Sequence, residues 1–75
     1  DADPHRNAEG RERGAALRVA LARLPPKEKA VFLLRHEQGM ALADIAAALG
    51  IAEGTVKAHL FHAVQKLRRT MEEGT

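Results

Sequence analysis

The sequence predicts an all-α domain of four helices, in which the last two helices form a helix-turn-helix. Alanine, leucine and valine supply most of the apolar residues and only 3% of residues are aromatic, a composition that favours closely packed helices over a sandwich or barrel. Apolar residues also recur at helical spacing in four segments separated by proline or glycine. A chain of 75 residues has room for one small domain.

The first two predicted helices meet at the pair Pro25-Pro26. The first begins near Ala15, and its apolar residues follow the i, i+3, i+4, i+7 spacing of one helix face: Leu17, Ala20, Leu21 and Leu24. Proline stops a helix but suits the first helical position. The second helix is therefore expected to have Pro26 at its first position, to continue over Lys27 to Glu37 and to end by Gly39. Its inward residues are expected to be Val31, Leu34 and either Phe32 or Leu33.

The third and fourth predicted helices are separated by only three residues, Gly50 to Ala52. The third covers Leu42 to Leu49, with Asp44 near its positive N-terminal end and an inward apolar stripe of Leu42, Ile45, Ala46 and Leu49. Gly50 suits the left-handed conformation that closes a helix. The fourth starts near Glu53 or Thr55 and runs to about Met71, and its core spacing is carried by Val56, Leu60, Ala63 and Leu67. So short a glycine-containing connection predicts a helix-turn-helix.

The predicted domain organisation is simple. Residues 1–14 mix charges with Pro4, Gly10 and Gly14 and are expected to be a flexible lead-in. Residues 15–71 form the domain, and residues 72–75 are a tail. The chain has no cysteine, which excludes disulfides and thiolate metal sites. Its apolar runs are far shorter than the roughly 20 residues that span a bilayer, so no membrane segment is expected.

The outward side of the fourth predicted helix has the properties of a DNA-reading surface. With 100° per residue, the side opposite Val56 carries small residues and hydrogen-bonding groups, and its flanks carry cations including Lys66. No carboxylate follows on this helix until Glu72. The candidate DNA-binding residues are Thr55, Lys57, Ala58, His59, Phe61, His62, Gln65, Arg68 and Arg69. Base-proximal roles are expected for His59, Phe61, His62 and Gln65, and phosphate contacts for Lys57, Arg68 and Arg69.

Phe61 adds weight to that interpretation. Many surface helices have a polar face that only meets solvent, so the charges alone do not establish a site. A large apolar side chain in the middle of the outward face is better explained by a partner, either thymine methyl groups in DNA or a protein. Thr55 can either cap the helix or contact a phosphate.

Four sequence elements carry a resemblance to a known family. They are Leu24-Pro25-Pro26 and the residues to Arg35, Asp44-Ile45-Ala46, Leu49-Gly50-Ile51, and Gly54-Thr55-Val56-Lys57. In this order and spacing they resemble region 4, the C-terminal domain of the extracytoplasmic-function sigma factors of the sigma-70 family. The resemblance covers roughly Ala15 to Arg69 and implies a winged-helix-like helix-turn-helix fold.

The resemblance also implies a function. It implies recognition of the minus 35 element of double-stranded promoter DNA, within a sigma factor that directs RNA polymerase to initiate transcription in the cytoplasm. The implied partners are the flap of the RNA polymerase beta subunit and an anti-sigma factor. The resemblance implies no enzyme activity and no cofactor, and the sequence has no paired carboxylates, catalytic triad or phosphate-binding glycine loop.

The two histidines of the fourth helix depart from the family pattern, which usually has arginine at His59 and His62 and often serine at Ala58. A neutral histidine can hydrogen-bond but adds no fixed charge. We therefore expect DNA affinity to rise as the pH falls through the ordinary range of histidine titration. The pair is not expected to bind metal, because neither a cysteine nor a nearby carboxylate completes a four-ligand site.

Two alternatives remain open from the sequence. A LuxR-type DNA-binding domain also fits Thr55 to His59 followed by Lys66-Leu67, and it would bind a palindromic site as a dimer, whereas region 4 binds an asymmetric site as a monomer. A protein-interaction module using Phe61, Met40 and the alanine-rich third helix is the other alternative. Added salt separates the latter from DNA binding, which weakens steeply as counterions are released.

Overall fold

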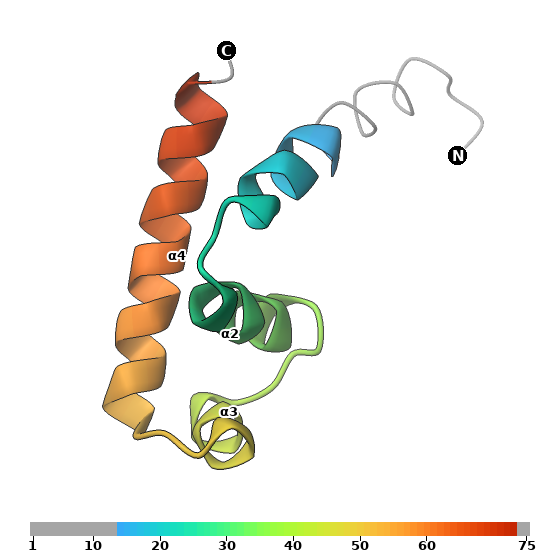
Figure 1. The fold of residues 1–75 in the computed structure, drawn as a ribbon. Coiled ribbons are helices and arrows are strands. Elements are labelled where there is room, and N and C mark those ends of the chain that lie inside the picture. The colour runs from blue at the N-terminus through green and yellow to red at the C-terminus, as the bar shows by residue number, and fades with distance from the viewer. Residues whose placement is uncertain (1–13, 74–75) are drawn as a thin grey trace, which may run out of the picture.

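The computed structural model describes residues 14–73, and these residues are all-helical with no strand (Figure 1). Residues 14–22 are helical and are followed by α2 (Pro26–His36), α3 (Leu42–Leu49) and α4 (Glu53–Glu73). The predicted four-helix class is confirmed. Because residues 14–73 contain no strand, their similarity to a winged helix is limited to the helices. Residues 1–13 of the expected lead-in lie outside the described residues, and so do residues 74–75 of the expected tail.

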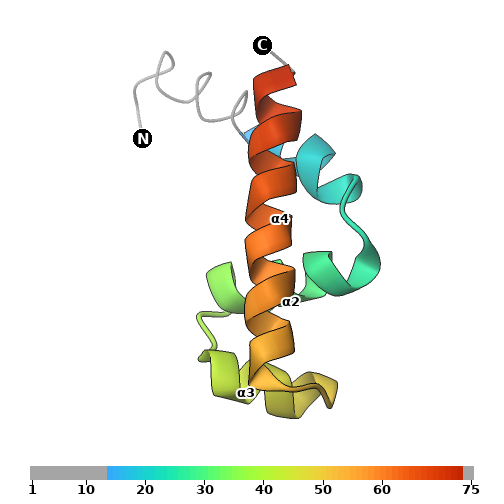
Figure 2. The same cartoon turned by 90° about the vertical axis from the view of Figure 1, so that its left-hand side faces the viewer.

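The longest helix, α4, runs along one side of the other helices, which lie behind it in Figure 2. Its 21 residues span about 31 Å. Along one edge it contributes to two buried clusters. The first contains Ala20, Leu24, Ala63 and Leu67, and the second contains Val31, Ile45, Ala46 and Val56. The predicted core edge of α4 is confirmed, with Leu60 half-buried beside the second cluster.

The start of α2 follows from the two prolines. Pro25 occupies the N-cap position with φ −56° and ψ 150°, and Pro26 is the first helical residue, as expected. The end of α2 comes at His36, before Gly39, because the amides of Glu37 and Gln38 both donate to the Leu33 carbonyl. Val31 is fully buried, and the other expected inward positions are half-buried: Phe32, Leu33 and Leu34.

The connection from α2 to α3 is held by two hydrogen bonds that bracket Gly39. The Met40 amide donates to the Leu34 carbonyl at 3.1 Å. The Arg35 guanidinium donates to the Met40 carbonyl at 2.8 Å. Gly39 itself has φ +69°, a conformation that glycine adopts at little cost. α3 then begins at Leu42, where the Ile45 amide donates to the Ala41 carbonyl at 3.0 Å.

The turn between α3 and α4 matches the predicted helix-turn-helix. Gly50 has φ 69° and ψ 35°, in the left-handed region, and the following Ile51 amide donates to the Ala46 carbonyl at 3.1 Å. The Ala52 carbonyl then accepts from Thr55 and Val56, so α4 starts at Glu53. One inward expectation is wrong: Leu49 is 39% exposed, because the chain turns away from the core directly after it.

No helix within the described residues has both the length and the hydropathy needed to cross a membrane.

Two glycines give opposite predictions for the same substitution. Gly50→Ala should lower the free energy of unfolding by about 1 kcal/mol or more, because an L side chain is strained at φ 69°. Gly54→Ala should raise it by about 0.5–1 kcal/mol, because Gly54 lies in α4 and an added Cβ would meet nothing within 4 Å. Urea unfolding of both variants against the parent chain measures the two shifts. If both substitutions changed the free energy of unfolding in the same direction, the assignment of a left-handed cap at Gly50 would be contradicted.

Candidate nucleic-acid interface

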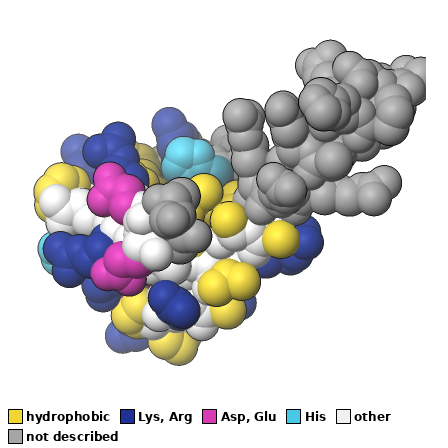
Figure 3. Space-filling model, turned by 90° about the horizontal axis from the view of Figure 1, so that it is seen from above, with side chains coloured by type: hydrophobic (Ala, Val, Ile, Leu, Met, Phe, Trp, Pro, Cys, Tyr) yellow, Lys and Arg dark blue, Asp and Glu magenta, His cyan; other side chains and the backbone are white. Residues whose placement is uncertain are grey.

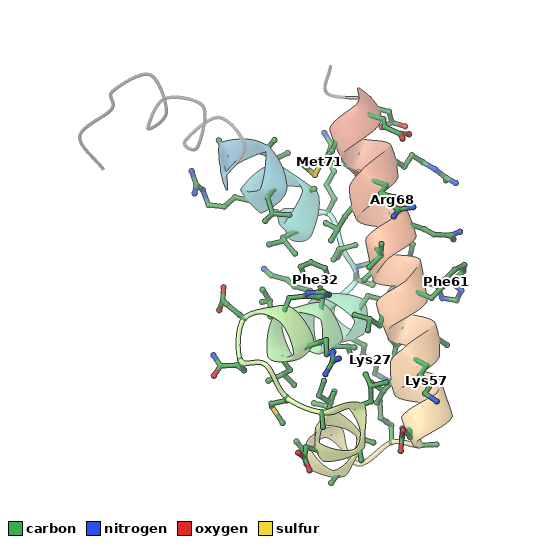
Figure 4. The ribbon with its side chains drawn as sticks, turned by 180° about the vertical axis from the view of Figure 1, so that it is seen from behind. Lys27, Phe32, Lys57, Phe61, Arg68 and Met71 are labelled. Carbon is green, nitrogen blue, oxygen red and sulfur yellow. The ribbon has the colours of Figure 1, made fainter. Side chains whose placement is uncertain are left out.

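The side of α4 that faces away from the core carries most of the predicted site residues. Those that are exposed are Thr55, Lys57, Ala58, Phe61, His62, Gln65, Arg68 and Arg69. In Figure 4, Lys57, Phe61 and Arg68 lie along α4, and Phe61 points away from α2. The two packed clusters therefore hold α4 by one edge and leave the opposite side open along the helix.

His59 differs from the other predicted site residues because it is half-buried. It lies three residues after Val56 and four before Ala63, and both of these side chains are fully buried. At helical spacing His59 therefore shares the edge of the core. It borders the exposed face of α4, whereas His62 lies on it.

Phe61 is the most exposed large apolar side chain in residues 14–73, with 59% of its surface accessible. Its ring lies 5.8 Å from that of His62, with 59° between the planes. Packing within the chain leaves most of this ring uncovered. The expectation that folding gives Phe61 no role in the core is confirmed.

The first turns of α4 also carry unusually small residues. Gly54 has an ordinary helical φ and no neighbour where a Cβ would stand, so neither backbone conformation nor packing requires glycine there. A glycine inside a helix nevertheless costs about 1 kcal/mol relative to alanine. Gly54 and Ala58, one turn apart, let a partner approach the backbone of α4 closely.

Thr55 lies inside the first turn of α4, because the helix begins two residues earlier. Its amide donates to the Ala52 carbonyl at 3.0 Å. The N-cap position belongs to Ala52, which has no side-chain acceptor. This position excludes the capping role expected for Thr55, and the phosphate contact stays a prediction.

The charge on this surface is positive. Between Gly54 and Met71, α4 contains no carboxylate. Seen from above, Lys and Arg side chains border the side of the molecule where α4 stands, and some acidic side chains are visible among them (Figure 3). The exposed cations of α4 run from Lys57, about 6 Å along the helix from Glu53, to Arg69, about 24 Å along it.

Lys66 is engaged within the fold, a feature that the sequence reasoning missed. Its Nζ atom lies 3.0 Å from Oε1 of Glu28 and donates a hydrogen bond to Oε2 at 3.1 Å. The Glu28 side chain is only 12% exposed, and Oε1 accepts no hydrogen bond. The pair joins the first turn of α2 to the middle of α4 and neutralises one of the cations counted on the flank of α4.

The position of Glu28 contained a signal for this pair. It is the third residue of α2, where a glutamate often bonds back to the N-cap amide. Pro25, at the N-cap, has no amide hydrogen to offer. The carboxylate must find another donor, and Lys66 supplies it.

Comparison with known proteins gives consistent findings. A family model described as "Sigma-70, region 4" matches residues 14–67. The chain is 48% identical over 54 residues to the ECF RNA polymerase sigma factor SigL of Mycobacterium tuberculosis. The matched segment covers 72% of this chain and 30% of SigL. It is also 43% identical over 58 residues to the RNA polymerase sigma-E factor of Streptomyces antibioticus. That match covers 77% of this chain and 32% of the factor.

A solved structure is similar as well. One chain of the structure titled "RsbN-BldN complex" aligns with a TM-score of 0.72 and 36% identity, over 85% of this chain and 46% of that one. The present chain thus spans about a third of the length of the curated relatives it matches.

The Glu28–Lys66 pair predicts an asymmetric response to mutation. Lys66→Met should lower the free energy of unfolding by about 1–3 kcal/mol, because it leaves a buried carboxylate without its counter-charge. Glu28→Gln should cost about 1 kcal/mol or less, because Lys66 is 49% exposed and remains hydrated. Denaturant unfolding measures both, with Arg69→Met as the matched control for loss of an exposed cation on α4. A Lys66→Met loss no larger than the control would show that the pair contributes nothing.

Proposed function

Because this chain belongs to the sigma-70 region 4 family, we propose that it recognises the minus 35 element of promoters. Binding would occur within a sigma factor that directs RNA polymerase to transcription initiation. The observation that carries the proposal is the uncovered side of α4, which combines small residues, hydrogen-bonding groups and cations directly after a tight helix-turn-helix. The activity is binding, and no catalytic step is involved.

The part of α4 from Glu53 to Gln65 lies in the major groove in this proposal. Gly54 and Ala58 allow the helix backbone to approach the base edges. His62 and Gln65 are exposed and supply hydrogen-bonding groups to bases, with His59 at the edge of the same surface. Lys57 and Thr55 contact phosphates, which fix the orientation of the helix without reading sequence.

Arg68 and Arg69 have a different place in this arrangement. They lie about 23–24 Å from the start of α4, one turn beyond Gln65, the last residue proposed to reach a base edge. Long side chains at this distance suit the phosphate backbone better than base edges. Their contribution would be electrostatic and independent of sequence.

The proposed protein partners follow from the relatives. SigL and the sigma-E factor are named as RNA polymerase sigma factors, and we propose that this domain also docks on the flap of the beta subunit. The similar chain in the "RsbN-BldN complex" is one component of a protein complex. This supports binding of an anti-sigma factor to the present domain. From these two proposed partners we also propose that the protein acts in the cytoplasm.

The family assignment favours an asymmetric DNA site bound by one copy of the domain, rather than the palindromic site of a LuxR-type dimer. A protein-interaction surface remains compatible with DNA binding, because an anti-sigma factor could cover the same residues. The domain would then bind either DNA or the anti-sigma factor, but not both at once. The salt dependence of each binding reaction, measured separately, distinguishes the two.

Lys57 provides the test of the proposed function. Lys57→Ala should weaken binding to all duplexes alike and reduce the slope of log K against log salt by about 0.9, the value for one lost phosphate contact. His62→Ala and Gln65→Ala should instead change the preferred sequence, with about 1–3 kcal/mol of discrimination lost at a contacted base pair. Selection from a randomised duplex library, followed by salt titration, measures both effects.

Arg18→Ala is the matched control for Lys57→Ala, because it removes the same charge from an exposed position in the helical residues 14–22. It should leave the salt slope unchanged. If the His62 and Gln65 variants select the same sequence as the parent chain, the assignment of the base-reading face to this side of α4 is wrong.

A further inference from the structure

Phe61 is an isolated apolar side chain on a polar surface. One turn before it lie Lys57 and Ala58, and one turn after it lies Gln65, all exposed. His62 is beside it, with its ring 5.8 Å away. The nearest large apolar neighbour at helical spacing is Val64, which is half-buried.

The other exposed large apolar residues do not extend this surface. Val19 belongs to the helical residues 14–22, and Leu49 ends α3. Met71 is about 15 Å farther along α4 and lies on the side facing residues 14–22, whereas Phe61 points away from α2 (Figure 4). The buried centre of a protein–protein interface needs several apolar residues together and is poor in charge. The surroundings of Phe61 do not have that composition.

The major groove of DNA has the complementary composition. It presents hydrogen-bond acceptors and donors among which the thymine C5-methyl is the apolar group. Phe61 is the ninth residue of α4, about 12 Å from Glu53, within the part of the helix proposed to lie in the groove. The small side chain of Ala58 one turn earlier permits the close approach that a contact with a methyl group requires.

We infer that Phe61 contacts the C5-methyl of a thymine and thereby selects a thymine at one step of the recognised element. This inference rests on the proposed DNA binding by α4 and adds a specificity-determining contact to it. The contact is apolar, so it adds sequence preference without adding to the salt dependence. It also sets Phe61 apart from His62 and Gln65, which read base edges through hydrogen bonds.

Replacing thymine by deoxyuridine tests the inference, because the change removes only the methyl group. Each thymine of the selected duplex is replaced in turn, on both strands, and the affinity is measured at fixed salt and pH. The parent chain should bind three- to fivefold more weakly at one position, which corresponds to about one lost methyl contact. Replacement at the other thymines should change affinity by less than about twofold.

Variants of the chain attribute the effect to Phe61. Phe61→Ala should bind the thymine duplex more weakly and should no longer distinguish thymine from deoxyuridine at that position. Phe61→Leu should retain part of the discrimination. Met71→Ala is the matched control, since it removes an exposed apolar side chain from the same helix, and should keep the full effect. Circular dichroism confirms that each variant remains helical.

The outcomes separate the inference from the proposed function. Absence of sequence-preferring binding to any duplex would contradict the proposed function itself. Sequence-preferring binding that is insensitive to every deoxyuridine replacement would overturn only the inference. So would an unchanged deoxyuridine effect in Phe61→Ala, because the methyl contact would then come from another residue. If Phe61→Ala lost binding to a proposed protein partner but kept its DNA binding, Phe61 would belong to the protein interface. That result would also overturn the inference.

Discussion

The buried edge of α4 is the constraint on which the rest of the molecule depends. Both hydrophobic clusters pack against it, one through Val56 and the other through Ala63 and Leu67. Burial of apolar surface is the dominant stabilising contribution in a domain of this size. Because the apolar residues of α4 lie along this edge, this edge is the part of the helix that packs against the rest of the domain. The opposite side of the same helix is then necessarily exposed. A single helix thus serves as the wall of the core and as the surface available to DNA.

The remaining features fix how α4 is presented. Gly50, in a left-handed conformation, ends α3 and brings α4 back across it. The Glu28–Lys66 pair ties α2 to α4 on one flank and withdraws a cation from the exposed charge. Gly54 has the reverse role, because it weakens the helix locally where the fold has no need of a small residue. The first two features serve the fold, whereas Gly54 is accounted for by the proposed contact with DNA.

Much of this fold could be predicted from the sequence because its determinants are local. Helical periodicity identified the core edge of α4, and the glycine and proline positions identified the ends of the helices. The outward side of α4 followed from the same periodicity, which is why Phe61 could be recognised as exposed. Pro25 at the N-cap indicates that Glu28 needs a donor other than the N-cap amide, but the identity of that donor could not be predicted, because Lys66 is 38 positions away and meets Glu28 only through tertiary packing. The half-burial of His59 and the exposure of Leu49 likewise depend on how far neighbouring elements cover a helix edge.

The most direct test of the central claim is a map of amide chemical-shift changes in the chain on titration with its selected duplex. The largest changes are expected on the exposed residues of α4 from Gly54 to Gln65, with residues 14–22 little affected. Changes concentrated on residues 14–22 or on the C-terminal end of α2, with Gly54 to Gln65 unaffected, would contradict this claim.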